Sequence, residues 1–169
     1  FFVTTADGTV VGDANGKFVT DSAGSFTVSG INPGTTLVVK ETRARGGYLL
    51  DDAPQTATIK AGQTVTLEFR NAPKGSLIIV KKDAVTGKTL QGVVFTVTTS
   101  SGQFVADAEG QISSNGLYYT DENGKIILSG LAPDTYVVTE TATIPGYVLD
   151  STPQAVVVNA NDTQTLTFT

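Results

Sequence analysis

Residues 65–82 read Val-Thr-Leu-Glu-Phe-Arg-Asn-Ala-Pro-Lys-Gly-Ser-Leu-Ile-Ile-Val-Lys-Lys, and they decide the fold because one repeat ends in the first half of this stretch and another begins in the second. Leu67 and Phe69 alternate with polar residues, which is the period-2 pattern of a half-buried β-strand. The same parity places Asn71 on the buried side. We therefore expect this strand to carry an amide into a core.

The alternation resumes after the Pro-Lys-Gly break with Leu77 and Ile79, and its parity places Lys81 on the buried side of the next strand. A buried amide or ammonium without a partner is costly, so buried polar groups are normally hydrogen-bonded. We expect Asn71 and Lys81 to have buried partners, and both are candidate functional residues.

Composition narrows the possible functions. The chain has 169 residues, 40% of them hydrophobic, which is enough for one large core or two small ones. It contains no Cys and no His, which excludes disulfides, thiolate or imidazole metal sites, and Ser-His or Cys-His nucleophiles. No acidic cluster has the spacing of a calcium loop, so no cofactor or metal is expected. The net charge of −5 argues against nucleic acid as a partner, and no run of about 18 apolar residues is present to insert into a membrane.

The chain repeats itself. Segment 48–69 aligns without a gap with 147–168, each residue n matching residue n + 99, and Glu41 matches Glu140 at the same offset. Further pairs repeat at an offset of 100: Thr20 with Thr120, Asp21 with Asp121, Gly24 with Gly124, and Ser29 with Ser129.

These repeats predict two domains, 1–73 and 74–169. Phe1 falls opposite Phe95, so a counterpart of the first strand of repeat 2, the strand with the candidate lysine, would precede Phe1. The last residue, in turn, stops one position short of the counterpart of Asn71. Each repeat therefore lacks one end, and we expect the chain to be a fragment of a longer one.

Repeat 2 predicts seven short strands rich in Val, Ile, Thr, Tyr and Phe, separated by Gly, Pro, Asn and Asp turns, and no helix. The predicted strands are 76–82, 93–99, 117–120, 125–128, 136–141, 154–158 and 163–169. This pattern is typical of an immunoglobulin-like β-sandwich. The predicted fold class is all-β, with two tandem sandwiches arranged end to end through a short linker.

Several motifs resemble one family. Segment 135–147, Thr-Tyr-Val-Val-Thr-Glu-Thr-Ala-Thr-Ile-Pro-Gly-Tyr, resembles the E-box of Gram-positive pilins and surface adhesins, and segments 76–83 and 120–124 are similar to the same family, the SpaA-type or Cna B-type domains with a prealbumin-like sandwich. The resemblance implies an extracellular protein anchored to a Gram-positive cell wall. It also implies neighbouring repeats and other pilin subunits, joined by sortase, as partners, and in many members an internal amide bond between a Lys of the first strand and an Asn of the last.

Parity supports that chemistry independently. Glu41 and Glu140 share strand faces with apolar residues and so point toward the cores. Burial disfavours charge on amines and carboxyls, a neutral amine is a nucleophile, and a protonated carboxyl can pass protons to departing ammonia. We therefore predict Lys81 and Asn71 as isopeptide cross-link residues of separate repeats, Lys81 with an asparagine that would follow Thr169 and Asn71 with a lysine of the strand that would precede Phe1. Glu41 and Glu140 are the predicted proton shuttles. Each bond would form once, which is self-processing and not enzymatic turnover.

Simpler interpretations stay open from the sequence alone. Lys81 at a strand end would then reach solvent, Glu140 would be a surface cross-strand partner, and Asn71 would open a turn. The function is either a structural stalk or pilin module, or an adhesin module that itself binds a host matrix protein or glycan. No motif identifies a binding face. The tyrosine pair 118–119 beside the longer loop 106–114 is the only exposed-looking aromatic feature that one repeat has and the other lacks.

Overall fold

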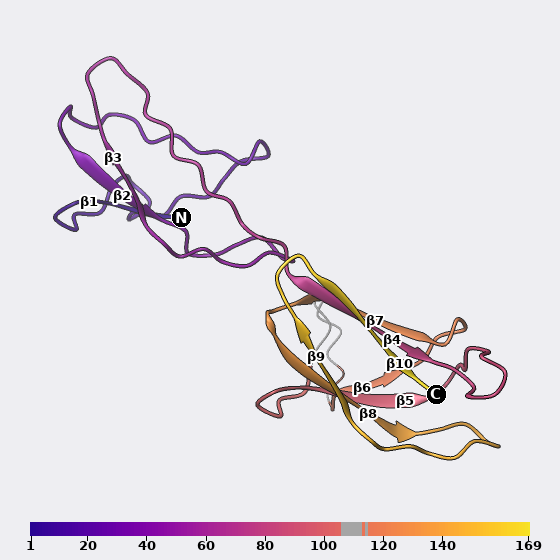
Figure 1. Cartoon of the computed structure of the whole chain (residues 1–169). Coiled ribbons are helices and arrows are strands. Elements are labelled where there is room, and N and C mark those ends of the chain that lie inside the picture. The colour runs from indigo at the N-terminus through magenta and orange to yellow at the C-terminus, as the bar shows by residue number, and fades with distance from the viewer. Residues whose placement is uncertain (106–112, 114) are drawn as a thin grey trace. The chain divides into compact units, whose positions relative to one another are not determined.

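The computed structural model describes residues 1–105, 113 and 115–169 (Figure 1). These residues form ten β-strands, and no helix among them is long and apolar enough to cross a membrane. The chain divides into two compact units. Unit 1 comprises Phe1–Arg45 and Leu50–Asn71, and unit 2 comprises Gly46–Leu49 and Ala72–Thr169. The domain boundary between 73 and 74 stays a prediction.

Unit 2 contains all seven strands that its sequence predicts, with ends shifted by at most three residues. They are β4 (Gly75–Lys81), β5 (Val94–Thr99), β6 (Leu117–Tyr119), β7 (Lys125–Leu131), β8 (Asp134–Ala142), β9 (Gln154–Val158) and β10 (Thr163–Phe168). The strong local alternation explains this agreement, because each strand buries one face: in β8, Tyr136, Val138 and Glu140 are buried between more exposed neighbours.

Two sheets enclose the core of unit 2. One has the order β10-β4-β7 and the other β6-β5-β8-β9. The first and last strands of the unit, β4 and β10, are parallel neighbours, and β4 also pairs with β7 in antiparallel fashion, which makes β4 the central strand of its sheet (Figure 1). Buried side chains from both sheets meet between them, among them Leu77, Ile79, Phe95, Val138 and Phe168.

Unit 1 contains one sheet, β1 (Phe2–Thr5), β2 (Thr36–Lys40) and β3 (Gln55–Thr58), in the order β1-β2-β3. Its register repeats that of β5-β8-β9 in unit 2. Thr4 lies opposite Val38 as Thr98 lies opposite Val137. The alignment of the two repeats therefore holds in three dimensions.

The counterparts of β7 and β10 in unit 1 are residues 25–31 and 64–69. They form no strand, although alternation predicts one around Leu67 and Phe69. Both side chains still lie on the half-buried side, next to a small core of Val3, Val11, Leu37 and Val39. A strand needs backbone partners, and in unit 2 the strand between β7 and β10 supplies them. Alternation in the sequence therefore specifies which side of a segment is buried, but a strand forms only where a neighbouring backbone pairs with it.

Candidate functional site

The site in unit 2 is a buried pair of opposite charge. The Nζ atom of Lys81 lies 2.8 Å from Oε2 of Glu140 and donates a hydrogen bond to it. Lys81 is 3% exposed and Glu140 is fully buried. Lys81 is the last residue of β4, and Glu140 comes from β8 of the opposite sheet, so strand parity turns both side chains into the space between the sheets.

The ion pair uses only one of the two carboxylate oxygens of Glu140. Oε1 of Glu140 is buried and has no hydrogen-bond partner among the described residues. Buried carboxylate oxygens normally accept hydrogen bonds, so such an atom calls for an explanation. Across the strands, Lys81 lies opposite Phe168 of β10 in the parallel register. The space near the lysine is therefore bordered by the end of the last strand.

The site in unit 1 is a carboxylate and an amide. Glu41 directly follows β2 and is 4% exposed. The side-chain nitrogen Nδ2 of Asn71 donates a 2.6 Å hydrogen bond to Oε2 of Glu41, and the backbone N–H of Asp51 donates to the same oxygen at 3.3 Å. Glu41 and Asn71 are separated by 30 positions along the chain, so the fold brings them together.

The Lys81–Glu140 pair and the Asn71–Glu41 pair lie at equivalent places in the two units, and each contains a different partner of the glutamate. Glu41 and Glu140 occupy the same place in the repeat, but Glu140 is joined to a lysine from the first strand and Glu41 to an asparagine that follows the last segment. The structure thus brings together Lys81 with Glu140 and Asn71 with Glu41. It places Lys81 and Asn71 in different units, each beside its own glutamate.

Two further polar residues of unit 2, Thr120 and Asp83, make hydrogen bonds that the sequence did not indicate. Thr120 is 3% exposed; its hydroxyl accepts a 3.0 Å hydrogen bond from the Val93 N–H and donates a 2.7 Å bond to the Leu90 carbonyl. These bonds fix the segment between β4 and β5. The sequence indicates Thr120 only through its repetition at Thr20, 100 positions earlier. That repetition does not reveal which groups the hydroxyl of Thr120 bonds.

The second group is Asp83, just beyond β4. Its Oδ2 accepts a 2.9 Å hydrogen bond from the hydroxyl of Tyr147, which belongs to the Pro-Gly-Tyr turn after β8. The pKa of Asp83 is lowered to about 2, first by the backbone N–H of Thr86, then by the Tyr147 hydroxyl and the N–H of Val85. This contact joins the end of the first strand to the turn that follows the glutamate strand.

The two tyrosines beside the longer loop differ in exposure, and the adhesin alternative stays a prediction. Tyr119 is 65% exposed, whereas Tyr118 is partly buried and its hydroxyl donates a hydrogen bond to the Val105 carbonyl. Residues 106–112 and 114 of that loop lie outside the described residues.

The two sheets of unit 2 define an all-β module of the prealbumin-like sandwich class with a buried polar pair between them. The sheet of unit 1 repeats the register of β5, β8 and β9. The family model of the SpaA prealbumin-like fold domain matches residues 1–73 and 75–169, and the chain belongs to this family. No protein with curated function matches the chain.

Three solved structures are similar to the chain. The Bacillus anthracis TIE protein is 28% identical over 79% of this chain, with a TM-score of 0.49, and the chain spans 24% of that protein's length. The shaft pilin SpaA of Lactobacillus rhamnosus GG is 21% identical, with 88% of this chain and 68% of the pilin covered and a TM-score of 0.48. The pilus 2b backbone protein of group B streptococcus is 24% identical, with coverages of 82% and 52% and a TM-score of 0.48.

Proposed function

We propose that the chain is a structural module of a pilus or stalk on the surface of a Gram-positive cell, and that a Lys–Asn amide joins the first and last strands of its units. One observation carries this proposal: a buried glutamate recurs at the same place in both units and holds a lysine in one and an asparagine in the other. Lysine, glutamate and asparagine together are the complete set for forming such an amide.

The proposed reaction starts at the lysine. Lys81 transfers a proton to the adjacent Glu140 carboxylate, which leaves a neutral amine as the nucleophile and a protonated acid. The amine then attacks the side-chain carbonyl carbon of an asparagine placed after the last strand. Holding both groups in one buried site supplies the high effective molarity of an oriented intramolecular reaction.

The glutamate also has a second role at the departing group. In unit 1 the atom that Glu41 contacts is Nδ2 of Asn71, the nitrogen that leaves as ammonia. A protonated glutamate at this position gives its proton to that nitrogen as the C–N bond breaks. In unit 2 the unpartnered Oε1 of Glu140 is the atom available for the same role.

The proposed amide bond would strengthen the unit against pulling force. The strands β4 and β10 are adjacent and parallel, and Lys81 is at the far end of β4 from Gly75. Force that enters at Gly75 would run along β4 and cross the amide, so that the rest of the unit carries none of it. Closing a loop of about 100 residues also stabilises by roughly 4–5 kcal/mol, on the estimate used for disulfides.

Mass spectrometry tests the proposal. A chain extended by one asparagine after Thr169 should lose one ammonia, and tandem fragmentation should place the link at Lys81. The matched control is extended by alanine and should lose none. Glu140→Gln in the asparagine-extended chain should slow the loss by about 100-fold or more, the usual size of a general acid–base contribution. An asparagine-extended chain that folds and keeps its full mass would refute the proposed amide.

A further inference from the structure

The outer face of the four-stranded sheet in unit 2 carries no charge. Along β5, β6, β8 and β9 the inward side chains form the core, and the residues between them point outward. The structure describes all four strands, and none of their outward residues is charged. These residues are threonines, aliphatic residues and one tyrosine, among them Thr96, Leu117, Tyr119, Val137, Thr139 and Val157.

The strand register joins these side chains into one continuous surface. Thr96 of β5 lies opposite Leu117 of β6 on one side and Thr139 of β8 on the other, in the middle of the face. Tyr119 and Val157 lie on the two edge strands, where they are 65% and 53% exposed. Four strands about 4.8 Å apart and about six residues long cover roughly 400 Å². Exposed surfaces of this kind commonly mark interaction sites.

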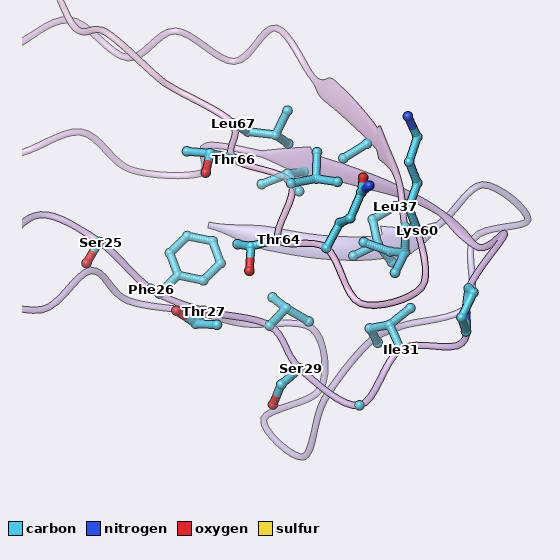
Figure 2. A pocket seen from close by; sticks show the side chains of 18 of the residues that line it. Ser25, Phe26, Thr27, Ser29, Ile31, Leu37, Lys60, Thr64, Thr66 and Leu67 are labelled. Carbon is cyan, nitrogen blue, oxygen red and sulfur yellow. The ribbon is translucent and has the colours of Figure 1, made fainter.

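The corresponding sheet of unit 1 shows how hydroxyl groups behave on such a face. Leu37 of β2 and Leu67 line a pocket on the inner side of this sheet (Figure 2). Side chains alternate along a strand, so Thr36 of β2 points outward. Its hydroxyl lies 3.0 Å from the hydroxyl of Thr58, which is opposite it on β3. Threonine hydroxyls thus bond to one another, because each can both donate and accept.

Unit 1 differs from unit 2 in carrying charge on this face. By register, Lys40 takes the place of Thr139 and Lys17 takes the place of Leu117. Both lysines are exposed, and the Nζ of Lys40 lies 3.5 Å from a carboxylate oxygen of Asp52. Lysine is therefore compatible with the fold at both places. The uncharged face of unit 2 is not a requirement of the sandwich, and it calls for another explanation.

The charge of the chain indicates which partner fits this face. The net charge is −5, so two copies repel each other where their acidic loops approach. That repulsion is least where the facing surfaces carry no charge. A surface of hydroxyl and methyl groups is also complementary to itself, whereas a strongly charged partner finds no opposite charge on it. The outer face of the other sheet suits this role less, because it is one strand narrower and carries the exposed Lys125.

We propose that two copies of the chain associate through this outer face of unit 2, packed sheet against sheet about a twofold axis. The same patch then serves both copies, with the sheets about 10 Å apart. Thr96 and Thr139 lie at the centre of the contact, and Tyr119 and Val157 cover its margins. The contact involves roughly 800 Å² in total, less than stable complexes bury, so we expect a dissociation constant of roughly 0.1–1 mM. The association does not depend on the proposed amide, and the two fail independently.

Analytical ultracentrifugation of the whole chain measures the association. A reversible dimer should form between roughly 0.1 and 1 mM, and raising NaCl from about 20 to about 300 mM should leave it as strong or stronger, because salt screens repulsion between acidic copies. A dimer that salt weakens by about tenfold would indicate pairing of opposite charges and overturn the proposal. A chain that stays monomeric at roughly 1 mM would overturn it too. Amide shifts on this face when cellohexaose is added to that monomer would assign the face to a glycan.

A lysine taken from the pattern of unit 1 tests the face directly. Thr139→Lys places two like charges close to the twofold axis and should weaken the dimer by about tenfold or more. Lys40 shows that the sheet accepts lysine at this place, and an amide NMR spectrum verifies the fold. The matched control is Thr165→Lys, which makes the same change of net charge at an exposed residue of β10 and should alter the dimer less than threefold. Equal effects of the two variants would overturn the proposal.

Cross-linking gives a readout that does not require weakening the contact. The chain has no cysteine, so one introduced thiol reports one position. Thr139→Cys treated with a short bis-maleimide should give a covalent dimer at least about tenfold faster than Thr165→Cys. An excess of the unmodified chain should lower the yield, because it competes for the same face. Equal rates for the two thiols would show that this face does not lie at the contact.

Discussion

Lys81 and Glu140 form a 2.8 Å ion pair between the two sheets of unit 2, with side-chain exposures of 4% and 0%. Removing two charges from water costs several kcal/mol per ion, and close pairing offsets that cost only in part. The pair is therefore a poor device for stability alone. The proposed amide formation gives this burial a role, because that reaction needs a dry site.

We expect the pair to behave as a coupled unit in stability measurements. Lys81→Met leaves a buried, unpaired Glu140 and should lower the free energy of unfolding of unit 2 by about 3–5 kcal/mol. The double variant Lys81→Met/Glu140→Leu should regain most of this loss, because no uncompensated charge remains. Lys82→Met is the matched control and should stay within about 0.5 kcal/mol. Urea unfolding followed at unit 2 amides measures all three, and a double variant as unstable as the single would contradict the expectation.

Thr120 should matter far more than its counterpart in unit 1. Thr120→Val keeps the shape but leaves the Val93 N–H and the Leu90 carbonyl without their buried partner, at about 1–3 kcal/mol for each group. Thr20→Val alters an exposed side chain and should change stability by less than about 0.5 kcal/mol. Thermal unfolding of the two variants makes the comparison. Equal losses would mean that Thr20 also bonds to a covering segment.

The Asp83–Tyr147 contact predicts a pH effect. Because its folded pKa of about 2 is below the ordinary 3.8, the ionised Asp83 stabilises the fold above pH 3.8, and this contribution is lost as pH falls toward 2. Tyr147→Phe should raise the pKa, though not to its ordinary value, because the N–H groups of Thr86 and Val85 remain. Carboxyl ¹³C NMR titration measures the shift. Tyr119→Phe should leave the Asp83 pKa where it is, and an equal shift there would remove the role of the Tyr147 hydroxyl.

Gly75 should be intolerant of a side chain. A Cβ atom at this position would lie 2.3 Å from Cγ1 of Val158 and 2.5 Å from the carbonyl oxygen of Asn159. Gly75→Ala must therefore shift β4 at the bulge where it begins, and we expect a loss of about 1–3 kcal/mol. A Cβ at Gly46 meets nothing within 4 Å, so Gly46→Ala should be close to neutral. Chemical denaturation distinguishes them, and a neutral Gly75→Ala would mean that β4 starts elsewhere.

The sequence by itself determined the strands of unit 2, the repeat, and the faces on which the site residues lie. These features are local, since the alternation of Leu77, Ile79 and Lys81 depends only on the pleat of one strand. The internal alignment adds the equivalence of Glu41 and Glu140 without any knowledge of their surroundings. Family motifs such as the segment around Tyr136 then identify the sandwich before any contact is known.

Only the tertiary structure decided which groups meet. The parallel pairing of β4 with β10, the contact of Tyr147 with Asp83, and the bonds of Thr120 join segments that are distant in the chain, and many partners fit the same local pattern. The same reason explains the error at residues 65–70: a period-2 pattern orients Leu67 and Phe69, but a strand forms only where a neighbouring backbone completes its hydrogen bonds. In unit 1 residues 64–69 form no such ladder, although Leu67 and Phe69 still face the small core of that unit.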